Sequence, residues 1–207
     1  YNSIKRSLPS SFIGFSDKLN KDGYCIIDTD LPMSLIDEAN DNIDDIVKNG
    51  SFKLNSKAYH YNDSPRIVEA WKDSIAKKKI ALCERILNFL NYSYQSSPIP
   101  FSTINFLNGA EQPLHSDEFH FGTIPHRYLT GAWFALEDIH EDSGPLSIAI
   151  NSHKLPIFSF EMIGLKNPKS EKQFKEYYTI YEDWVRQIIK DNSIEIVTPK
   201  LKKGQCL

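Results

Sequence analysis

The feature that most constrains the fold is a change in the character of the chain at about residue 94. Beyond it, five prolines between residues 98 and 145 separate short segments rich in Phe, Ile, Thr, Tyr and Trp. Segments of this kind, bounded by turn-forming residues, are typical of β-strands. Before it, apolar residues at helical spacing predict helices over residues 34–47 and 75–90. Helices followed by a β-rich body indicate an α+β domain, mainly β, built on an antiparallel sandwich or barrel.

The strand pattern is clearest in two segments that we expect to form a hairpin. Residues 128–136 and 146–150 are largely apolar, and residues 142–145 between them form the turn sequence Asp-Ser-Gly-Pro. The strand pattern returns at residues 194–197 and again after Gly204. These segments extend the expected sheet beyond the hairpin.

A further helical stretch lies between the expected strands. It places apolar and aromatic side chains from Phe174 to Ile188 largely on one face. We expect a single domain over residues 1–207, with residues 157–190 as a helical insertion within it. The insertion is either a lid over the mouth of a site or an ordinary outer helix packed on the sheet.

Composition and charge exclude several classes of protein. The chain has 207 residues, 41% of them hydrophobic and 25% charged, which is unlike a disordered or collagen-like protein. A net charge of −3 gives no attraction to phosphate backbones, so we expect no nucleic-acid partner. The longest apolar run, residues 132–136, is too short to span a bilayer. Three cysteines without metal-site spacing fit a reducing compartment, and we expect a cytoplasmic location.

Two His-x-Asp triplets, His115-Ser-Asp117 and His140-Glu-Asp142, are the best lead to chemistry. The second lies in a turn-forming loop, so we expect it to be solvated. The first lies in residues 113–121, where apolar and polar residues roughly alternate. In an extended segment residues i and i+2 share a face, so His115 and Asp117 would bind one metal ion there. They would supply two ligands of the two-His, one-carboxylate triad of non-heme Fe(II) oxygenases, and a surface His–Asp pair is the alternative.

Three longer stretches extend this signal. They are LNKDGYCIIDTDLP over residues 19–32, FLNGAEQPLHSDEFHF over residues 106–121, and GAWFALEDIHEDSGPLSIAINSHKLP over residues 131–156. Together they resemble the phytanoyl-CoA dioxygenase family of Fe(II)- and 2-oxoglutarate-dependent oxygenases. The resemblance implies a double-stranded β-helix (jelly-roll, cupin-like) core with flanking N-terminal helices.

The resemblance also implies site residues and cofactors. It assigns His115 and Asp117 to Fe(II), with 2-oxoglutarate and O2 as cosubstrates. It places Trp133 at the 2-oxoglutarate pocket, although an inward-facing core aromatic is an equal alternative. Gln112 matches a polar position that leads into the metal strand, and Thr103 matches a position where relatives contact the cosubstrate.

Other parts of the expected site follow the metal pair along the chain. His120 and Phe121 are expected to face a small-molecule substrate, and a buried, hydrogen-bonded imidazole is the alternative for His120. The resemblance places the second iron-binding histidine, and an arginine that pairs with 2-oxoglutarate, beyond Leu207. We therefore expect either a chain that continues past Leu207, which we favour because Gly204 begins a strand-like segment, or a pseudoenzyme.

The leading hypothesis is a dioxygenase that hydroxylates an unactivated C–H bond of a small or medium-sized metabolite. Halogenating relatives lack the carboxylate ligand, so Asp117 favours hydroxylation. The first alternative is a non-catalytic jelly-roll binding protein, and the second is a zinc hydrolase that uses the same pair.

Overall fold

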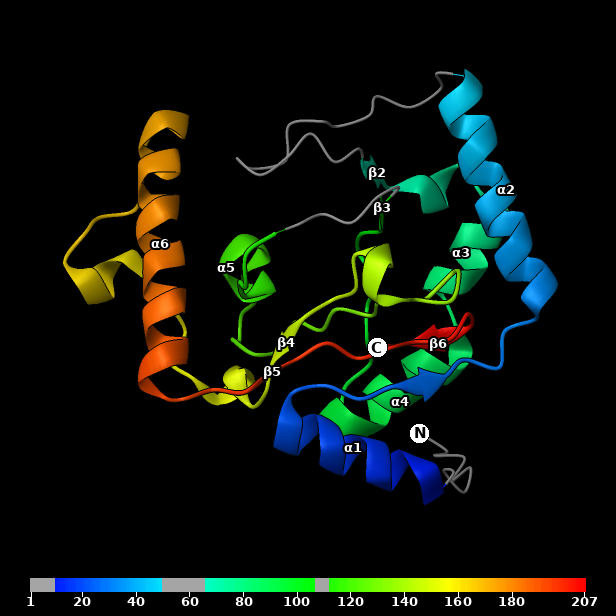
Figure 1. The fold of residues 1–207 in the computed structure, drawn as a ribbon, viewed down its shortest axis with the longest axis horizontal. Coiled ribbons are helices and arrows are strands. Elements are labelled where there is room, and N and C mark those ends of the chain that lie inside the picture. The colour runs from blue at the N-terminus through cyan, green and yellow to red at the C-terminus, as the bar shows by residue number, and fades with distance from the viewer. Residues whose placement is uncertain (1–9, 50–65, 107–111) are drawn as a thin grey trace. The chain divides into compact units, whose positions relative to one another are not determined.

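The computed structural model describes residues 10–49, 66–106 and 112–207 (Figure 1). Its α-helices are α1 (Ser10–Asp22), α2 (Met33–Asn49), α3 (Ile75–Ala81), α4 (Glu84–Tyr94), α5 (Asp117–Phe121) and α6 (Glu171–Asp191). Its strands are β1 (Ile27–Asp28), β2 (Arg66–Val68), β3 (Ile104–Phe106), β4 (Ile148–Ala149), β5 (Ile196–Val197) and β6 (Gln205–Cys206). Short 3-10 helices are η1 (Ala70–Lys72), η2 (Glu141–Ser143), η3 (Ser152–Lys154) and η4 (Phe160–Ile163). None of the helices in these ranges combines the length and apolarity needed to cross a membrane.

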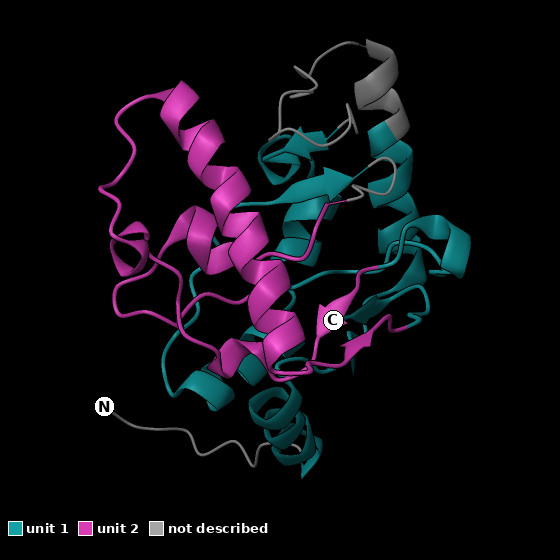
Figure 2. Ribbon diagram, turned by 60° about the vertical axis from the view of Figure 1, so that its left-hand side comes forward, with its two compact units in different colours: residues 1–111, 132–145, 200–207 teal, residues 112–131, 146–199 magenta. Residues whose placement is uncertain are grey.

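The chain divides into two compact units (Figure 2). Unit 1 consists of Tyr1–Glu111, Ala132–Pro145 and Lys200–Leu207, and unit 2 consists of Gln112–Gly131 and Leu146–Pro199. Each unit has its own buried apolar side chains. The expected single domain over residues 1–207 stays a prediction, and the expected insertion over residues 157–190 lies within unit 2.

The prediction of a mainly β fold is wrong for the described residues, where helices contain far more residues than strands. The strands are two or three residues long and pair only in twos, all antiparallel: β1 with β6, β2 with β3, and β4 with β5. No closed barrel is formed within the described ranges.

The predicted hairpin between residues 128–136 and 146–150 is also wrong. β4 pairs with β5, so that Ile148 faces Val197 and Ala149 faces Ile196. The loop that was expected to close the hairpin instead contains η2, which is a helical turn and not a tight strand reversal. The expected strands at residues 194–197 and after Gly204 are confirmed as β5 and β6.

Part of the expected strand over residues 128–136 pairs with β6 in unit 1. Trp133 N donates to Leu207 O at 2.8 Å, and Leu207 N donates back to Trp133 O at 2.9 Å. Phe134 bridges Cys206, which also faces Ile27 of β1. β6 therefore lies between two backbone segments and joins them, and the buried side chains of β1 and β6 contribute to a core with α1 and α4.

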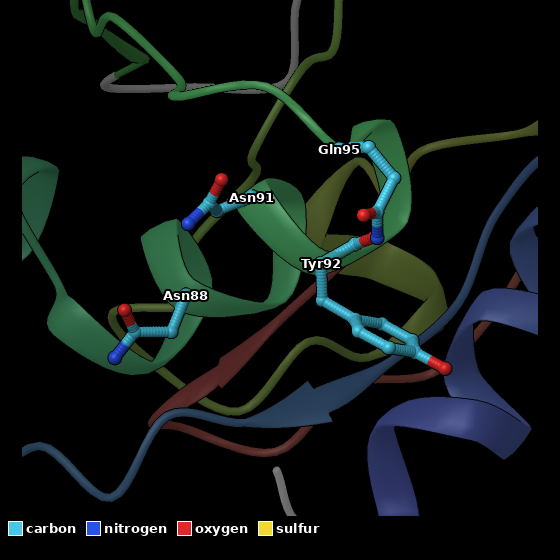
Figure 3. A pocket seen from close by; sticks show the side chains of 4 residues that line it. All are labelled: Asn88, Asn91, Tyr92 and Gln95. Carbon is cyan, nitrogen blue, oxygen red and sulfur yellow. The ribbon is translucent and has the colours of Figure 1, made fainter. Parts of the chain in front are cut away.

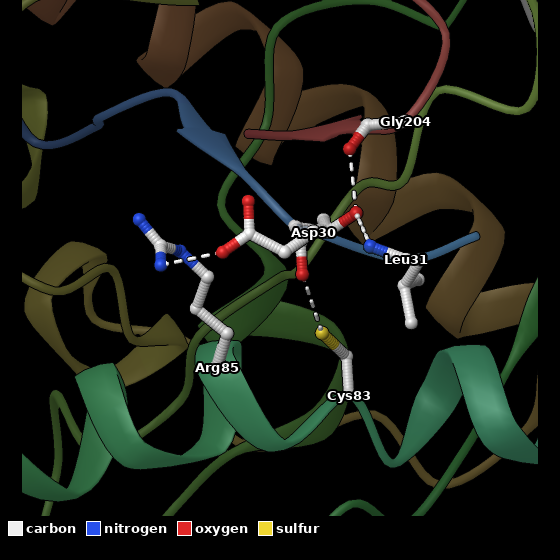
Figure 4. A network of polar contacts seen from close by, with 6 residues as sticks. Asp30, Leu31, Cys83, Arg85 and Gly204 are labelled. Atoms are coloured by element: carbon white, nitrogen blue, oxygen red, sulfur yellow. Dashed lines mark hydrogen bonds and ion pairs between the residues drawn. The ribbon is translucent and has the colours of Figure 1, made fainter. Parts of the chain in front are cut away.

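Thr29 fixes the chain where it leaves β1, through hydrogen bonds to Gly204, Leu31 and Cys83, which Figure 4 labels. Its Oγ1 donates to Gly204 O at 2.6 Å and accepts from Leu31 N at 3.4 Å. Its carbonyl accepts from Cys83 Sγ at 3.7 Å. Gly204 has a φ of +88°, a left-handed conformation that L side chains rarely adopt, so the turn before β6 favours glycine.

Two of the predicted helices are confirmed as α2 and α6. The helix predicted between them differs from the structure. The single helix expected over residues 75–90 is split into α3 and α4 at Leu82 and Cys83. Cys83 has a ψ of 111°, which interrupts the helical hydrogen-bond ladder. Ile80 before the break and Ile86 after it are both buried, so the apolar spacing of the sequence gives no sign of the break.

The Glu69 carboxylate connects η1 to the segment before β3 by hydrogen bonds. Its Oε1 accepts from Thr103 N at 3.2 Å, and its Oε2 accepts from Trp71 Nε1 at 3.1 Å and pairs with Lys72 Nζ at 2.8 Å. Hydrogen bonds from Lys72, then Ser102 and Trp71, lower the pKa of Glu69 from its ordinary 4.5 to about 2.

Replacing Glu69 with Gln is expected to lower the free energy of unfolding near neutral pH by about 1–2 kcal/mol. The reason is that the groups bonded to Glu69 would then meet a neutral acceptor in place of a charged one. Lys72 is 66% exposed, so solvent screens part of the ion pair. Since the folded pKa is depressed, the contribution is complete above about pH 4.5 and is lost as the pH falls toward about 2. Urea unfolding measures the difference in the free energy of unfolding between the variant and the wild type, and this difference should shrink as the pH falls through this range. Glu38→Gln, on the exposed face of α2, is the control. A difference that does not change with pH would contradict the assignment.

Candidate functional site

The structure brings His115 and Asp117 together in unit 2. His115 Nε2 lies 3.4 Å from Asp117 Oδ1, and the two side chains are 23% and 52% exposed. The other ring nitrogen, Nδ1, lies 2.8 Å from Pro113 O, which can only accept a proton. The ring is therefore oriented by its own backbone, with Nε2 toward the carboxylate.

The backbone that achieves this differs from the expected extended segment. Ser116 is extended, with φ −106° and ψ 127°, but Asp117 is the first residue of α5. The prediction that His115 and Asp117 share a strand face is therefore wrong, although the pairing of the two side chains is correct. The run Asp-Glu-Phe-His-Phe contains no glycine or proline and two acidic residues in its first turn, which favours a helix start.

Asp117 is held in its ionised form. The hydrogen bond from His115 is the main cause that lowers the pKa of Asp117; burial opposes it, and the charges of His115 and His120 add to the lowering. An imidazole nitrogen and a carboxylate oxygen both bind divalent transition metals at about 2.0–2.2 Å. A separation of 3.4 Å is short enough for the two atoms to contact one cation. No cluster of three or more His, Cys, Asp or Glu that could hold a metal occurs in the part of the chain that the structure describes.

Two predicted substrate residues, His120 and Phe121, lie in the same short helix as Asp117. The His120 ring centroid is 5.3 Å from that of His115, and His120 Nε2 is 3.4 Å from Tyr178 Oη. His120 is half-buried, whereas Phe121 is 49% exposed at the end of α5. His120 thus lies close to His115. It has a polar partner in Tyr178, as expected under the alternative of a hydrogen-bonded imidazole.

The remaining predicted residues are divided between the units. Gln112 is half-buried in unit 2, three residues before His115. Thr103 and Trp133 belong to unit 1. Thr103 Oγ1 is buried with no hydrogen-bond partner among the described residues. Trp133 packs on the buried cluster that contains Leu201, which is the setting of a core aromatic. The predicted roles of these three residues in binding 2-oxoglutarate stay predictions.

The second triplet lies at the surface, as expected for a solvated turn. His140 and Asp142 are both exposed at η2. His140 N donates to Ser143 Oγ at 3.3 Å, which closes the turn. A shallow hollow of about 240 Å³ on α4, lined by Asn88, Asn91, Tyr92 and Gln95, includes none of the predicted site residues (Figure 3).

An aromatic cluster that the sequence pattern did not link to the site packs against α5, the helix that begins at Asp117. It consists of the residues that surround Phe119 in unit 2, namely Phe158, Phe160, Phe174, Tyr178 and Tyr181. The Phe119 ring stacks on Tyr181 with centroids 3.8 Å apart and planes 6° apart. The aromatic face of α6 is thus buried against α5 and the chain around η4, while the lid expected over residues 157–190 stays a prediction.

Tyr181 also contacts the peptide between the two metal-ligand candidates. Ser116 N donates to Tyr181 Oη at 2.6 Å. Burial raises the pKa of Tyr181 to about 12, so its hydroxyl is neutral at physiological pH. The sequence signal for this residue was its place on the aromatic face of the helix, which indicates burial but not the partner.

Comparisons with known proteins give one family and one fold. The family model described as Phytanoyl-CoA dioxygenase (PhyH) matches residues 19–207. A search of curated proteins found no match. Solved structures that are similar include the non-heme alpha-ketoglutarate-dependent epimerase SnoN from nogalamycin biosynthesis, with 18% identity and a TM-score of 0.60 over 96% of this chain and 72% of that one.

Two further solved structures agree with this likeness. SnoN in complex with Fe3+, alpha-ketoglutarate and nogalamycin RO has 17% identity and a TM-score of 0.58, over 96% of this chain and 73% of that chain. The alpha-ketoglutarate-dependent carbocyclase SnoK has 14% identity and a TM-score of 0.65, over 93% of this chain and 72% of that one. At these identities the likeness shows that the chain shares the fold of these proteins.

Phe119→Ala is expected to lower the free energy of unfolding by about 3 kcal/mol, because it removes the ring at the centre of the aromatic cluster. Phe121→Ala, two residues along the same helix and 49% exposed, is the matched control and should cost less than about 1 kcal/mol. Urea unfolding followed by circular dichroism measures both values. Equal losses in the two variants would show that the cluster does not hold α5.

Proposed function

The chain belongs to the phytanoyl-CoA dioxygenase family, and from this premise we propose that it is an Fe(II)- and 2-oxoglutarate-dependent dioxygenase that hydroxylates a small or medium-sized metabolite. The observation that carries the proposal is the 3.4 Å separation between His115 Nε2 and Asp117 Oδ1. The pair matches the family in residue type and spacing, and its geometry suits one divalent cation.

The donor set of the pair fits iron. Nitrogen and carboxylate ligands are those of the non-heme Fe(II) facial triad, with His115 and Asp117 as two of its three protein ligands. When bound, iron would activate O2, which is the oxidant, 2-oxoglutarate would supply two of the electrons that reduce O2, and the protein would position the reactants. The third protein ligand is not assigned to a residue here.

The residues around the pair prepare it for a metal. Pro113 O accepts the Nδ1 proton of His115, so Nε2 is the nitrogen that binds metal once its proton is released. Asp117 is ionised at neutral pH, as an aspartate ordinarily is, and its lowered pKa extends this to more acidic solution. A carboxylate ligand, as opposed to an open position for a halide, argues against halogenation, and hydroxylation is the reaction that we propose for this chain.

Thr103, Trp133 and Gln112 are the residues proposed to contact 2-oxoglutarate. His120 and Phe121 are proposed to face the substrate, since both follow Asp117 in α5. O2 and a small-molecule substrate are the other reactants, and no nucleic-acid partner is expected.

The second candidate function is a non-catalytic binding protein of the same fold. The observation behind it is the pair itself: His115 and Asp117 lie 3.4 Å apart, and a protein that only binds needs no complete iron site. The two functions differ in whether the full chain binds Fe(II) and converts 2-oxoglutarate to succinate.

Asp117→Ala is expected to abolish Fe(II) binding and the uncoupled decarboxylation of 2-oxoglutarate, because it removes the anionic ligand. Asp142→Ala, in the exposed second triplet, should leave both unchanged and alter stability by no more than about 0.5 kcal/mol. The measurements are anaerobic titration of the full chain with Fe(II) and 2-oxoglutarate, followed by its charge-transfer absorption, and succinate release in air.

Three outcomes decide between the proposals. Loss in Asp117→Ala alone supports the oxygenase with this ligand pair. Loss in Asp142→Ala alone would mean that the wrong triplet has been chosen. A wild-type chain that neither binds Fe(II) nor releases succinate would favour the binding protein.

A further inference from the structure

The peptide that separates the two metal-ligand candidates is attached to another helix. Ser116 lies between His115 and Asp117, and its N–H donates to Tyr181 Oη at 2.6 Å. The Tyr181 side chain is only 1% exposed and extends from α6, which has 21 residues. The length of α6 and the burial of its aromatic face make it a firmer support than the five-residue α5.

The same tyrosine also contacts the chain on the other side of Asp117. Phe119, two residues further on, stacks on the Tyr181 ring with centroids 3.8 Å apart. The hydroxyl and the ring of one side chain therefore hold residues 116 and 119, with Asp117 between them. Both contacts lie within unit 2, as do the ligand candidates.

We propose that Tyr181 is a positioning residue for the metal pair, which rests on the function proposed above. His115 is oriented by Pro113 O, so the backbone at Ser116 decides where Asp117 lies relative to the His115 ring. The Ser116 side chain makes no capping hydrogen bond to α5, so it does not fix this backbone itself. The Tyr181 hydroxyl fixes it by accepting the Ser116 N–H.

Tyr181→Phe tests the proposal because it keeps the stacked ring and removes only the acceptor of the Ser116 N–H. We expect the dissociation constant for Fe(II) to rise about tenfold, the size typical of residues that orient metal ligands. Tyr177→Phe is the matched control. Tyr177 lies on the same helix and packs on Phe160, but its hydroxyl accepts from Gln173 Nε2 at 2.9 Å, so metal affinity should not change.

Two readouts separate positioning from general support of the fold. In Co(II)-loaded protein, the ligand-field absorption should change in Tyr181→Phe and not in Tyr177→Phe. In metal-free wild-type protein, the Ser116 amide should be protected from hydrogen exchange, and in Tyr181→Phe that protection should fall at least about tenfold. The wild-type measurement does not depend on how well the variant folds.

The outcomes distinguish this inference from the proposed function. Unchanged affinity and spectrum in Tyr181→Phe, or an unprotected Ser116 amide in the wild type, would overturn the role of Tyr181 and leave the oxygenase proposal standing. A wild-type chain that binds neither Fe(II) nor Co(II) would overturn both. Weaker metal binding in Tyr181→Phe alone, with a changed spectrum, would establish the positioning role.

Discussion

The stack of Phe119 on Tyr181 is the contact on which the geometry of unit 2 depends. A helix as short as α5 has too few internal hydrogen bonds to be stable alone, so its place is set by tertiary packing. Phe119 supplies that packing because its ring meets aromatic rings from α6 and from the chain around η4. The candidate ligand Asp117 is thereby placed by residues far from it in sequence, while His115 is placed by the local backbone of Pro113.

The fold was predictable where the signal is local. The helices α2 and α6 have apolar residues at regular spacing over several turns, and both were predicted. The break at Cys83 was not, since a buried cysteine there continues the apolar spacing while its backbone leaves the helix. Strand pairing was wrong for β4 because pairing is decided by partners far away in sequence, and residues adjacent along the chain were a poor guide to them.

The sequence predicted which two residues lie together at the candidate site better than it predicted the backbone conformation that brings them together. The His-x-Asp spacing and the family resemblance identified His115 and Asp117, but strand alternation was the wrong reason for their proximity, because one extended residue and a helix start bring them together. Tyr181 could not be assigned from the sequence. Its place on an aromatic face predicts burial, and only the structure shows that its hydroxyl meets a peptide 65 residues away.

The central place of β6 in unit 1 has a consequence for how the chain acquires its structure. Gln205 of β6 bonds Asp28 of β1 across a separation of 177 residues, whereas Ser116 and Tyr181 are 65 residues apart. Closing a longer loop costs more entropy, and contacts between distant residues slow folding. On a ribosome, β1 emerges before residues 205 and 206 and stays without this partner until they follow. The Ile27 side chain, which is buried in the folded protein, is open to chaperones or to aggregation during that interval.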